Sequence, residues 1–308
     1  MHSGISVSAE IAAVVGNHQG EHVLGDCLDS LRNQSRPVSS LLVVDGASTD
    51  RSAELAEELG AQLVRAPNRG LGFLYNLGAR AAESEYVLFS NNDVAYEPDC
   101  VARLAAALDA DERRFAADPT QLDWSDGRVI HARTTLARGR LWREYLPGLH
   151  LDDVEHADSI VPTVSAHGAA MLVRRAPLLE LGGFDETFFM EWEDLDLCWR
   201  AWLRGWPTVY VPDARLRHRV GAVTTQGVRA RRNASSHHNL LRFALKCLPR
   251  SAAARVVAGE LLRLPRHPRA ISLAFLRLGA ELRDVRRARR ELRPRRDLLD
   301  WMLAGQPG

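Results

Sequence analysis

The sequence predicts an α/β fold with a mostly parallel, doubly wound sheet, followed by a basic helical region. Two observations predict this organisation. Short apolar runs alternate with segments of helical periodicity through the first ninety or so residues. The charge balance then changes along the chain. Residues 229–296 hold nineteen Arg or Lys against four Asp or Glu, a balance of +15, whereas residues 1–228 have a balance of −12.

The elements follow in order, each with its own signal. Apolar runs that end in Gly, Asp or Asn predict strands, and helices are predicted where apolar residues recur at helical spacing or where capping residues precede and Gly follows a segment. We expect irregular structure with short strands over 109–160, which is polar, and amphipathic helices broken by Pro249, Pro265 and Pro268 beyond 229. The expected strands are 10–16, 40–49, 61–67 and 85–93, and the expected helices are 20–34, 48–60 and one that ends within 76–85.

These signals divide the chain into a domain at 1–228 and a basic amphipathic helical region at 229–308. The four cysteines show no paired metal-binding spacing, so we interpret them as reduced thiols in a cytoplasmic protein. We see no secretion signal and no run of about 18–20 apolar residues, so no membrane span is expected.

Polar side chains follow two of the expected strands, where ligands of doubly wound sheets bind. Asp45 ends one run, and its carboxylate could accept hydrogen bonds from a nucleotide; the alternative is a helix N-cap. Asp93 ends another in "FSNNDV", and it could bind Mg²⁺ or Mn²⁺ that holds a diphosphate. The alternative there is an Asn-Asn-Asp turn. A lone histidine such as His218 is more often structural, so we consider it a metal ligand only together with Asp93.

A further stretch, "NRGLGFLYNLG" at 68–78, combines glycines that let the backbone approach a ligand with Arg69, which could meet phosphate. A plain junction between a loop and a helix is the alternative for this stretch.

The segment "GGFDETFFMEWEDLDLCWRAWLRGW" at 182–206 places many acids among aromatic residues. At helical spacing Glu193 and Asp196 fall near one side, with Asp194 beside them. Desolvation against Trp192 would raise the pKa of a carboxyl, which suits a general base acting on a sugar hydroxyl. The alternative is an amphipathic helix with acids in its first turn.

Taken in order over residues 10–220, these motifs resemble an inverting glycosyltransferase of the GT-A fold, family 2, in its rhamnosyltransferase-like branch. The resemblance implies a Rossmann-like nucleotide-sugar-binding fold and a Mg²⁺ or Mn²⁺ cofactor. Asn91 stands where the family usually has the first Asp of Asp-x-Asp. The implied donor is a nucleotide-diphosphate sugar, with dTDP-rhamnose favoured, and the implied acceptor is a lipid-linked or polysaccharide hydroxyl in cell-envelope glycan synthesis.

The resemblance also assigns residue roles. Asp194 is the implied catalytic base and Glu193 supports it, while Asp93 and His218 hold the metal. The implied sugar or acceptor pocket consists of Trp192, Gly168 and Glu191, and the implied donor-binding residues are Asn17, Asp45, Arg69, Gly72, Asn76, Asn92 and Asp93.

Three other readings compete with this one. A nicotinamide dehydrogenase would show G-x-G-x-x-G after the first strand, but the sequence there is "VVGNHQGEHV". A nucleic-acid-binding or membrane-binding module would explain the basic region alone. A degenerate transferase would bind the sugar nucleotide without turnover.

We expect no nucleic acid as a partner, and we expect residues 229–296 to lie on an anionic membrane surface at the inner face of the cell membrane. The alternative is that this region caps the acidic domain.

Overall fold

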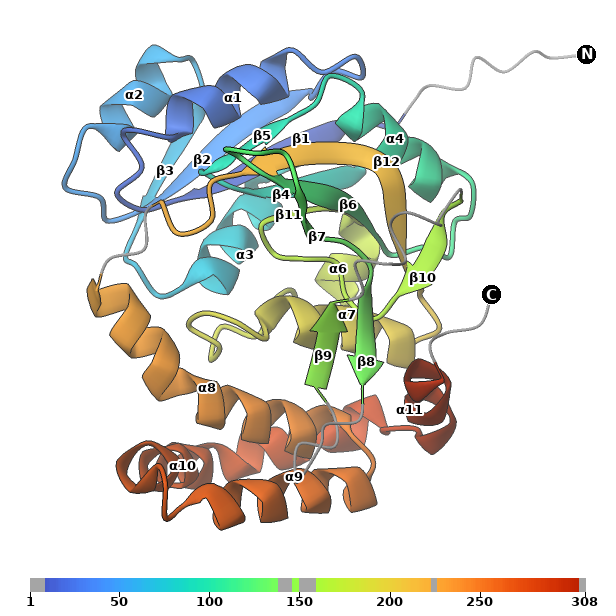
Figure 1. Ribbon diagram of the computed structural model, residues 1–308. Coiled ribbons are helices and arrows are strands. Elements are labelled where there is room, and N and C mark those ends of the chain that lie inside the picture. Colours follow the sequence, from blue (N-terminus) through green and yellow to red (C-terminus); the bar gives the residue numbers. More distant parts are fainter. Residues whose placement is uncertain (1–8, 138–145, 150–158, 223–225, 305–308) are drawn as a thin grey trace, which may run out of the picture.

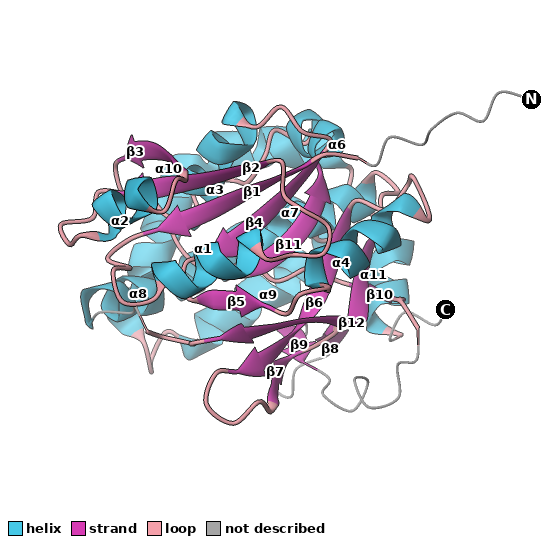
Figure 2. Ribbon diagram, turned by 90° about the horizontal axis from the view of Figure 1, so that it is seen from above, coloured by secondary structure: helices cyan, strands magenta, loops and turns pink. Residues whose placement is uncertain are grey.

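The computed structural model describes residues 9–137, 146–149, 159–222 and 226–304, and its main element is a mixed sheet (Figures 1 and 2). The eight strands of its main path run in the order β10-β12-β6-β11-β4-β1-β2-β3, and β5 and β7 pair at its side. The strands are β1 (Ile11–Asn17), β2 (Ser40–Gly46), β3 (Gln62–Ala66), β4 (Tyr86–Asn91), β5 (Val94–Tyr96), β6 (Ala116–Asp123), β7 (Val129–His131), β10 (Val161–Thr163), β11 (Ala170–Arg174) and β12 (Thr208–His218). A separate hairpin pairs β8 (Thr134–Ala137) with β9 (Leu146–Leu149).

The first half of the sheet is parallel, as expected. β1 pairs in parallel with both β2 and β4, and β2 with β3. The register brings the carboxyl ends together, since Asn17 pairs with Asp45 and Gly16 with Asn91. The polar residues that end these strands therefore share one edge of the sheet, as the sequence predicts.

Helices cover both faces of the sheet, which confirms the doubly wound arrangement. Alternate β1 residues face opposite sides, as strand geometry requires. Ile11 packs with α1 (Leu24–Arg32), α2 (Ser52–Glu58) and α4 (Cys100–Asp109). Ala12 packs with the other layer, formed by α3 (Leu71–Ala81), α6 (Arg175–Glu180) and α7 (Glu193–Leu203).

The expectation of irregular structure over 109–160 is wrong for 116–123. These residues form β6, a buried strand between β12 and β11. Its sequence, AADPTQLD, lacks the apolar pattern that is typical of a buried strand. It can still be buried because its polar groups have buried partners: Thr120 Oγ1 lies 2.5 Å from Tyr210 Oη. Pro119 is tolerated because the β12 register shifts just beside it, and proline in sheets is found at bulges.

The C-terminal helices form a layer below the sheet, next to α7 (Figure 1). They are α8 (Gln226–Cys247), α9 (Arg250–Arg263), α10 (Pro268–Leu292) and α11 (Arg296–Leu303). The three prolines lie at helix boundaries, as expected. α8 begins before the proposed boundary at 228/229, which therefore falls within a continuous helix. None of the described helices has the length and apolar content of a bilayer span.

Part of this layer is joined to the first domain by a shared hydrophobic core. Phe188 and Trp199 of the acidic segment pack in one buried cluster with Phe243, Cys247 and Met302 of the C-terminal helices. The Trp199 indole donates a hydrogen bond to the Cys247 carbonyl at 3.2 Å. The C-terminal helices therefore cap the first domain at this shared core, which was the alternative to membrane binding in the sequence analysis.

Candidate active site

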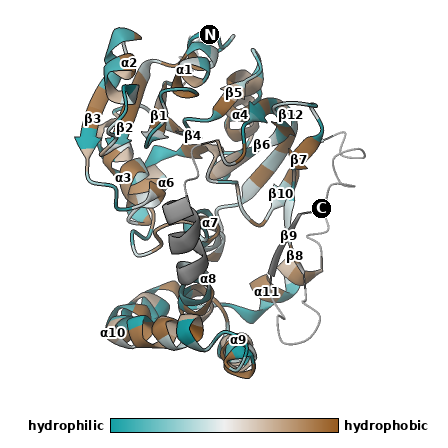
Figure 3. Ribbon diagram, turned by 60° about the vertical axis from the view of Figure 1, so that its left-hand side comes forward, coloured by the Kyte–Doolittle hydropathy of each residue, from teal (hydrophilic) through white to brown (hydrophobic). Residues whose placement is uncertain are grey.

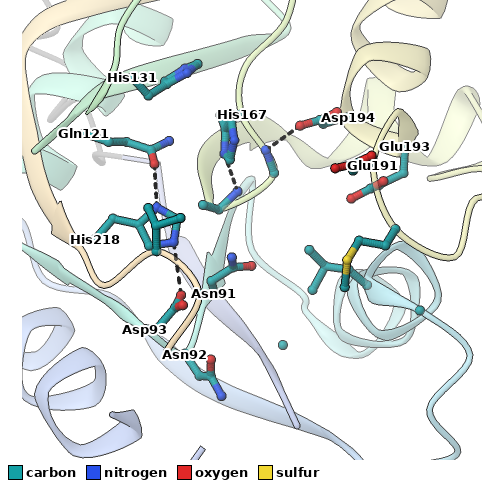
Figure 4. A pocket seen from close by; sticks show the side chains of 18 of the residues that line it. Asn91, Asn92, Asp93, Gln121, His131, His167, Glu191, Glu193, Asp194 and His218 are labelled. Atoms are coloured by element: carbon teal, nitrogen blue, oxygen red, sulfur yellow. Dashed lines mark hydrogen bonds and ion pairs between the residues drawn. The ribbon is translucent and has the colours of Figure 1, made fainter. Parts of the chain in front are cut away.

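A cavity of about 890 Å³ opens at the edge where the parallel strands end (Figure 4). This is the volume range of small-molecule sites. Residues from both halves of the sheet and from the start of α7 line it. Of the residues singled out from the sequence, it brings together Asn17, Asn92, Asp93, Gly168, Glu191, Trp192, Glu193, Asp194 and His218.

Asn17 connects two strand ends in the floor of the cavity. Its Nδ2 donates to Asp45 Oδ1 at 2.7 Å and to Ser52 Oγ at 2.9 Å, and its Oδ1 accepts from Asn92 Nδ2 at 2.6 Å. Asp45 also accepts from the backbone N and the Oγ of Ser48. Asp45 is buried and orients Asn17, which lines the cavity, and its expected contact with a nucleotide stays a prediction.

Three expected donor-binding residues lie outside the cavity lining. Asn76 donates to the Phe184 carbonyl at 2.9 Å and accepts from its N–H at 2.8 Å. A Cβ on Gly72 would lie only 3.0 Å from Phe184 Cβ, so glycine permits this close packing. Arg69 pairs with Glu186 at 3.5 Å. These residues hold the start of the acidic segment against α3, and their expected donor-binding role stays a prediction.

Asp93 and His218 meet on one side of the cavity. Asp93 Oδ1 lies 3.3 Å from His218 Nε2, and His218 Nδ1 lies 2.8 Å from Gln121 Oε1. With the Nδ1 proton donated to the Gln121 oxygen, Nε2 presents a lone pair on the side of Asp93. Asp93 Oδ1 is buried and has His218 Nε2 as its neighbour. A carboxylate oxygen and an imidazole nitrogen at this separation fit two ligand atoms of one divalent cation.

A complete metal site is not formed by side chains alone. Within the described residues, no group of three or more His, Cys, Asp or Glu side chains is arranged to hold a metal. Asp93 and His218 would therefore share the ion with oxygens of a bound diphosphate and with water, as is usual for Mg²⁺.

Asp194 and Glu193 lie apart from this pair, at the start of α7 (Figure 4). Asp194 Oδ2 accepts from Gly168 N at 2.8 Å and Oδ1 from Leu195 N at 2.7 Å. Burial raises the pKa of Asp194, and these two N–H donors oppose the rise. Glu193 Oε2 has no partner, and burial together with the Asp194 charge raises the pKa of Glu193 to about 8. Burial and mutual repulsion therefore let this pair hold a proton to higher pH than free carboxyls do.

Two other acids of the segment, Asp185 and Asp196, do not line the cavity. Asp196 is fully buried and pairs with Lys246 at 2.6 Å and Arg200 at 2.8 Å. Asp185 pairs with Lys246 at 2.5 Å and Arg242 at 2.9 Å, which hold the pKa of its carboxyl well below the usual range. Asp196 does not join Glu193 at the cavity, because it pairs with Lys246 of α8 and with Arg200 of α7 itself.

A buried His–Asp pair in the cavity wall was missed from the sequence. His131 Nε2 lies 3.0 Å from Asp118 Oδ2, and the His167 backbone N donates to Asp118 Oδ1 at 3.0 Å. Both histidine rings line the cavity, 4.7 Å apart, and burial holds the pKa of His167 well below its usual value. The residue that could have indicated this pair is Asp118, but it lies in β6, whose polar composition did not predict a strand.

Carboxylates from two parts of the fold, Asp93 just after β4 and Asp194 at the start of α7, thus face one cavity. A family model described as Glycosyl transferase family 2 matches residues 13–174. The chain belongs to glycosyltransferase family 2. The family and the GT-A fold expected from the sequence are thereby confirmed, and the nicotinamide dehydrogenase is excluded.

Two curated relatives are rhamnosyltransferases. The chain is 32% identical over 209 residues to the N-acetylglucosaminyl-diphospho-decaprenol L-rhamnosyltransferase of Mycobacterium tuberculosis, covering 59% of this chain and 67% of that protein. It is 27% identical over 140 residues to rhamnosyltransferase WbbL of Escherichia coli, covering 43% of this chain and 52% of that protein.

Solved structures share the fold at low identity. The mannosyltransferase PcManGT of Pyrobaculum calidifontis, in complex with GDP-Man and Mn²⁺, aligns with a TM-score of 0.56 and 19% identity over 96% of this chain and 84% of that one. GalNAc-T7 with UDP, GalNAc and Mn²⁺ aligns with a TM-score of 0.63 and 15% identity, over 80% of this chain but 49% of that one. This chain thus spans about half the length of the latter protein.

Proposed function

We propose that the protein is an inverting glycosyltransferase that moves a sugar from a nucleotide-diphosphate donor to an acceptor hydroxyl. One observation supports this most strongly: Asp194 and Glu193, carboxyls at the start of α7, line the same cavity as the Asp93–His218 pair. A base on one side and a diphosphate site on the other are what a single displacement requires.

In this mechanism Asp194 takes the proton from the acceptor hydroxyl. The oxygen forms a bond to the anomeric carbon from the face opposite the leaving diphosphate, and the bond from that carbon to the diphosphate oxygen breaks, so the configuration inverts. No sugar–enzyme bond forms. Glu193 keeps its proton and adds no second charge beside Asp194. A divalent cation held by Asp93 and His218 would neutralise the departing diphosphate.

For the donor and acceptor we propose dTDP-rhamnose and a lipid-linked sugar. The support is the pair of relatives named rhamnosyltransferases, one of which is named for a decaprenol-diphosphate acceptor. A polysaccharide acceptor in the cell envelope is the second possibility.

A lipid-linked acceptor requires contact with a membrane, and we propose that the turn between α9 and α10 provides it at the cytoplasmic face. Residues 261–280 contain four arginines and no acid. Four of the seven large exposed hydrophobic residues of the described chain lie here: Leu261, Leu262, Leu273 and Leu276. Exposed leucines among arginines are typical of a surface for anionic lipid headgroups.

The faces of α10 refine the sequence-based expectation. Ala274 and Leu278 are buried, whereas Leu276 is 73% exposed, so the apolar residues of α10 divide between a packing face and an outer face. Both α9 and α10 alternate hydrophobic and hydrophilic residues (Figure 3). The C-terminal region would thus cap the fold with one face and meet the membrane with another.

Asp194→Asn should abolish transfer while it leaves donor binding nearly intact, because the amide cannot accept the proton. Removal of a positioned base costs about 10²–10⁴ in rate. The assay is transfer of labelled rhamnose from dTDP-rhamnose to a polyprenyl-diphosphate N-acetylglucosamine, alongside dTDP binding by calorimetry. Glu193→Gln is the matched control and should lose far less, because Glu193 is neutral. Near wild-type turnover by Asp194→Asn would remove Asp194 as the base.

Asp93→Ala should weaken donor binding, and chelation should inhibit until Mg²⁺ or Mn²⁺ is restored, because the diphosphate charge is left uncompensated. Binding of dTDP with and without EDTA measures this, and Asp123→Ala, at another acid of the cavity wall, is the control. Unchanged dTDP affinity and full activity after thorough chelation would refute the metal site.

The protein should sediment with phosphatidylglycerol vesicles at low salt and be released at high salt, since each basic residue near an anionic surface contributes about 1 kcal/mol. Leu261→Asp combined with Leu276→Asp should prevent sedimentation, whereas Leu179→Asp, at an exposed leucine of the first domain, should not. Point variants are preferable to truncation, because α9 and α11 contribute to the shared core. If the full chain stays in the supernatant at low salt, the region is a cap only.

A further inference from the structure

Two consecutive residues in the cavity wall have an unusual backbone. Glu191 has a φ of 65° and Trp192 a φ of 77°, in the left-handed region that L-residues other than Asn and Asp rarely adopt. Such residues persist only where the surroundings hold them. Both line the cavity and directly precede Glu193, where α7 begins. The conformation of this turn therefore determines the positions of the Glu193 and Asp194 side chains, which follow it directly.

A side chain of the C-terminal region holds this turn. Asn239 of α8 donates from Nδ2 to the Met190 carbonyl at 3.0 Å and to the Glu191 carbonyl at 3.1 Å. Its Oδ1 lies 3.2 Å from His238 Nδ1, which fixes the orientation of the amide. Asn239 is 1% exposed and is not among the residues that line the cavity.

The same face of α8 also packs against the turn. Phe243, one helical turn after Asn239, lies with its ring centroid 5.5 Å from that of Trp192. Two backbone carbonyls and one indole of the turn are thus held by side chains four residues apart. A turn held only by its own backbone would have no such contacts to offset its left-handed residues.

We propose that Asn239 is a positioning residue for catalysis: through the Met190–Trp192 turn, it places Asp194 at the cavity against the backbone N–H of Gly168. This rests on the proposed function and extends it, because the transferase site then includes the C-terminal region. The first 228 residues alone would keep the donor-side residues but lack the contact that fixes the base.

Asn239→Leu, which keeps the size but removes both donors, and Asn239→Asp, which keeps the shape but places an acceptor against two carbonyls, test the proposal. Amide hydrogen exchange in peptides covering 189–195 should rise about tenfold or more in both variants, because local opening is no longer opposed. Peptides of β1 and β4 should be unchanged. For transfer, kcat should fall roughly 10–100-fold, since small misplacements are costly, while KM for dTDP-rhamnose stays within about twofold.

His237→Gln is the matched control. His237 lies two residues away on α8, and its ring pairs with Glu260 of α9 instead of the turn. This variant should leave both the exchange of 189–195 and kcat near the wild-type values. The exchange measurement needs no substrate, so it decides the contact even if the wild-type protein transfers no sugar.

Wild-type exchange rates in 189–195 for both Asn239 variants would overturn the proposal. So would equal losses in kcat and in donor affinity, because Asn239 would then support the whole fold and not the position of the base.

Discussion

The site depends on how four carboxylates of one short segment are paired. Asp185 and Asp196 are neutralised by basic side chains, whereas Glu193 and Asp194 are not paired with any Lys or Arg in the described residues. Asp185 and Asp196 bind Arg242 and Lys246 from α8, which fixes the segment against the C-terminal helices. Asp194 instead accepts hydrogen bonds from the backbone N–H groups of Gly168 and Leu195, and Glu193 Oε2 accepts none. A lysine or arginine paired with Asp194 would lower its basicity, and an unpaired Asp196 in the core would be strongly destabilising.

This division explains why acids and aromatic residues share the segment 182–206. Phe188, Trp199, Trp192 and Trp202 pack in the hydrophobic interface between the first domain and the C-terminal layer, whereas Phe184 and Trp206 pack in the core beside the sheet. The same burial raises the pKa of Glu193 at the edge of that interface. The opposite charges of the two regions therefore meet in part at this contact, while the arginines of 261–280 belong to a different, outward surface.

Sequence patterns predicted what depends on local periodicity and on strand ends. The parallel strands, the shared edge of Asp45 with residues 91–93, and the helix boundaries at the prolines all follow from nearby residues. Sequence patterns gave wrong or missing predictions where contacts between residues far apart in the chain determine the structure. β6 is a strand because Asp118 and Thr120 find partners far along the chain, and Asn76 is held by Phe184. The separation of Asp196 from Glu193 could not be read from helical spacing, because it is α8 that selects which acid is neutralised.

The central claim is that Glu193 holds a proton at neutral pH and leaves Asp194 ionised, and unfolding free energy against pH tests it directly. The folded protein keeps this proton up to about pH 8, whereas an unfolded chain releases it near the ordinary pKa of 4.5. Stability from this group is thus fully present below about pH 4.5 and is lost as pH rises towards 8, with a slope of up to about 1.4 kcal/mol per pH unit. Relative to Glu193→Gln, the wild-type protein should lose stability between pH 5 and pH 8, and Asp194→Asn should keep that slope over a narrower pH range, because burial still raises the pKa of Glu193 when the Asp194 charge is gone. Parallel profiles for wild type and Glu193→Gln, or loss of the slope in Asp194→Asn alone, would contradict the assignment.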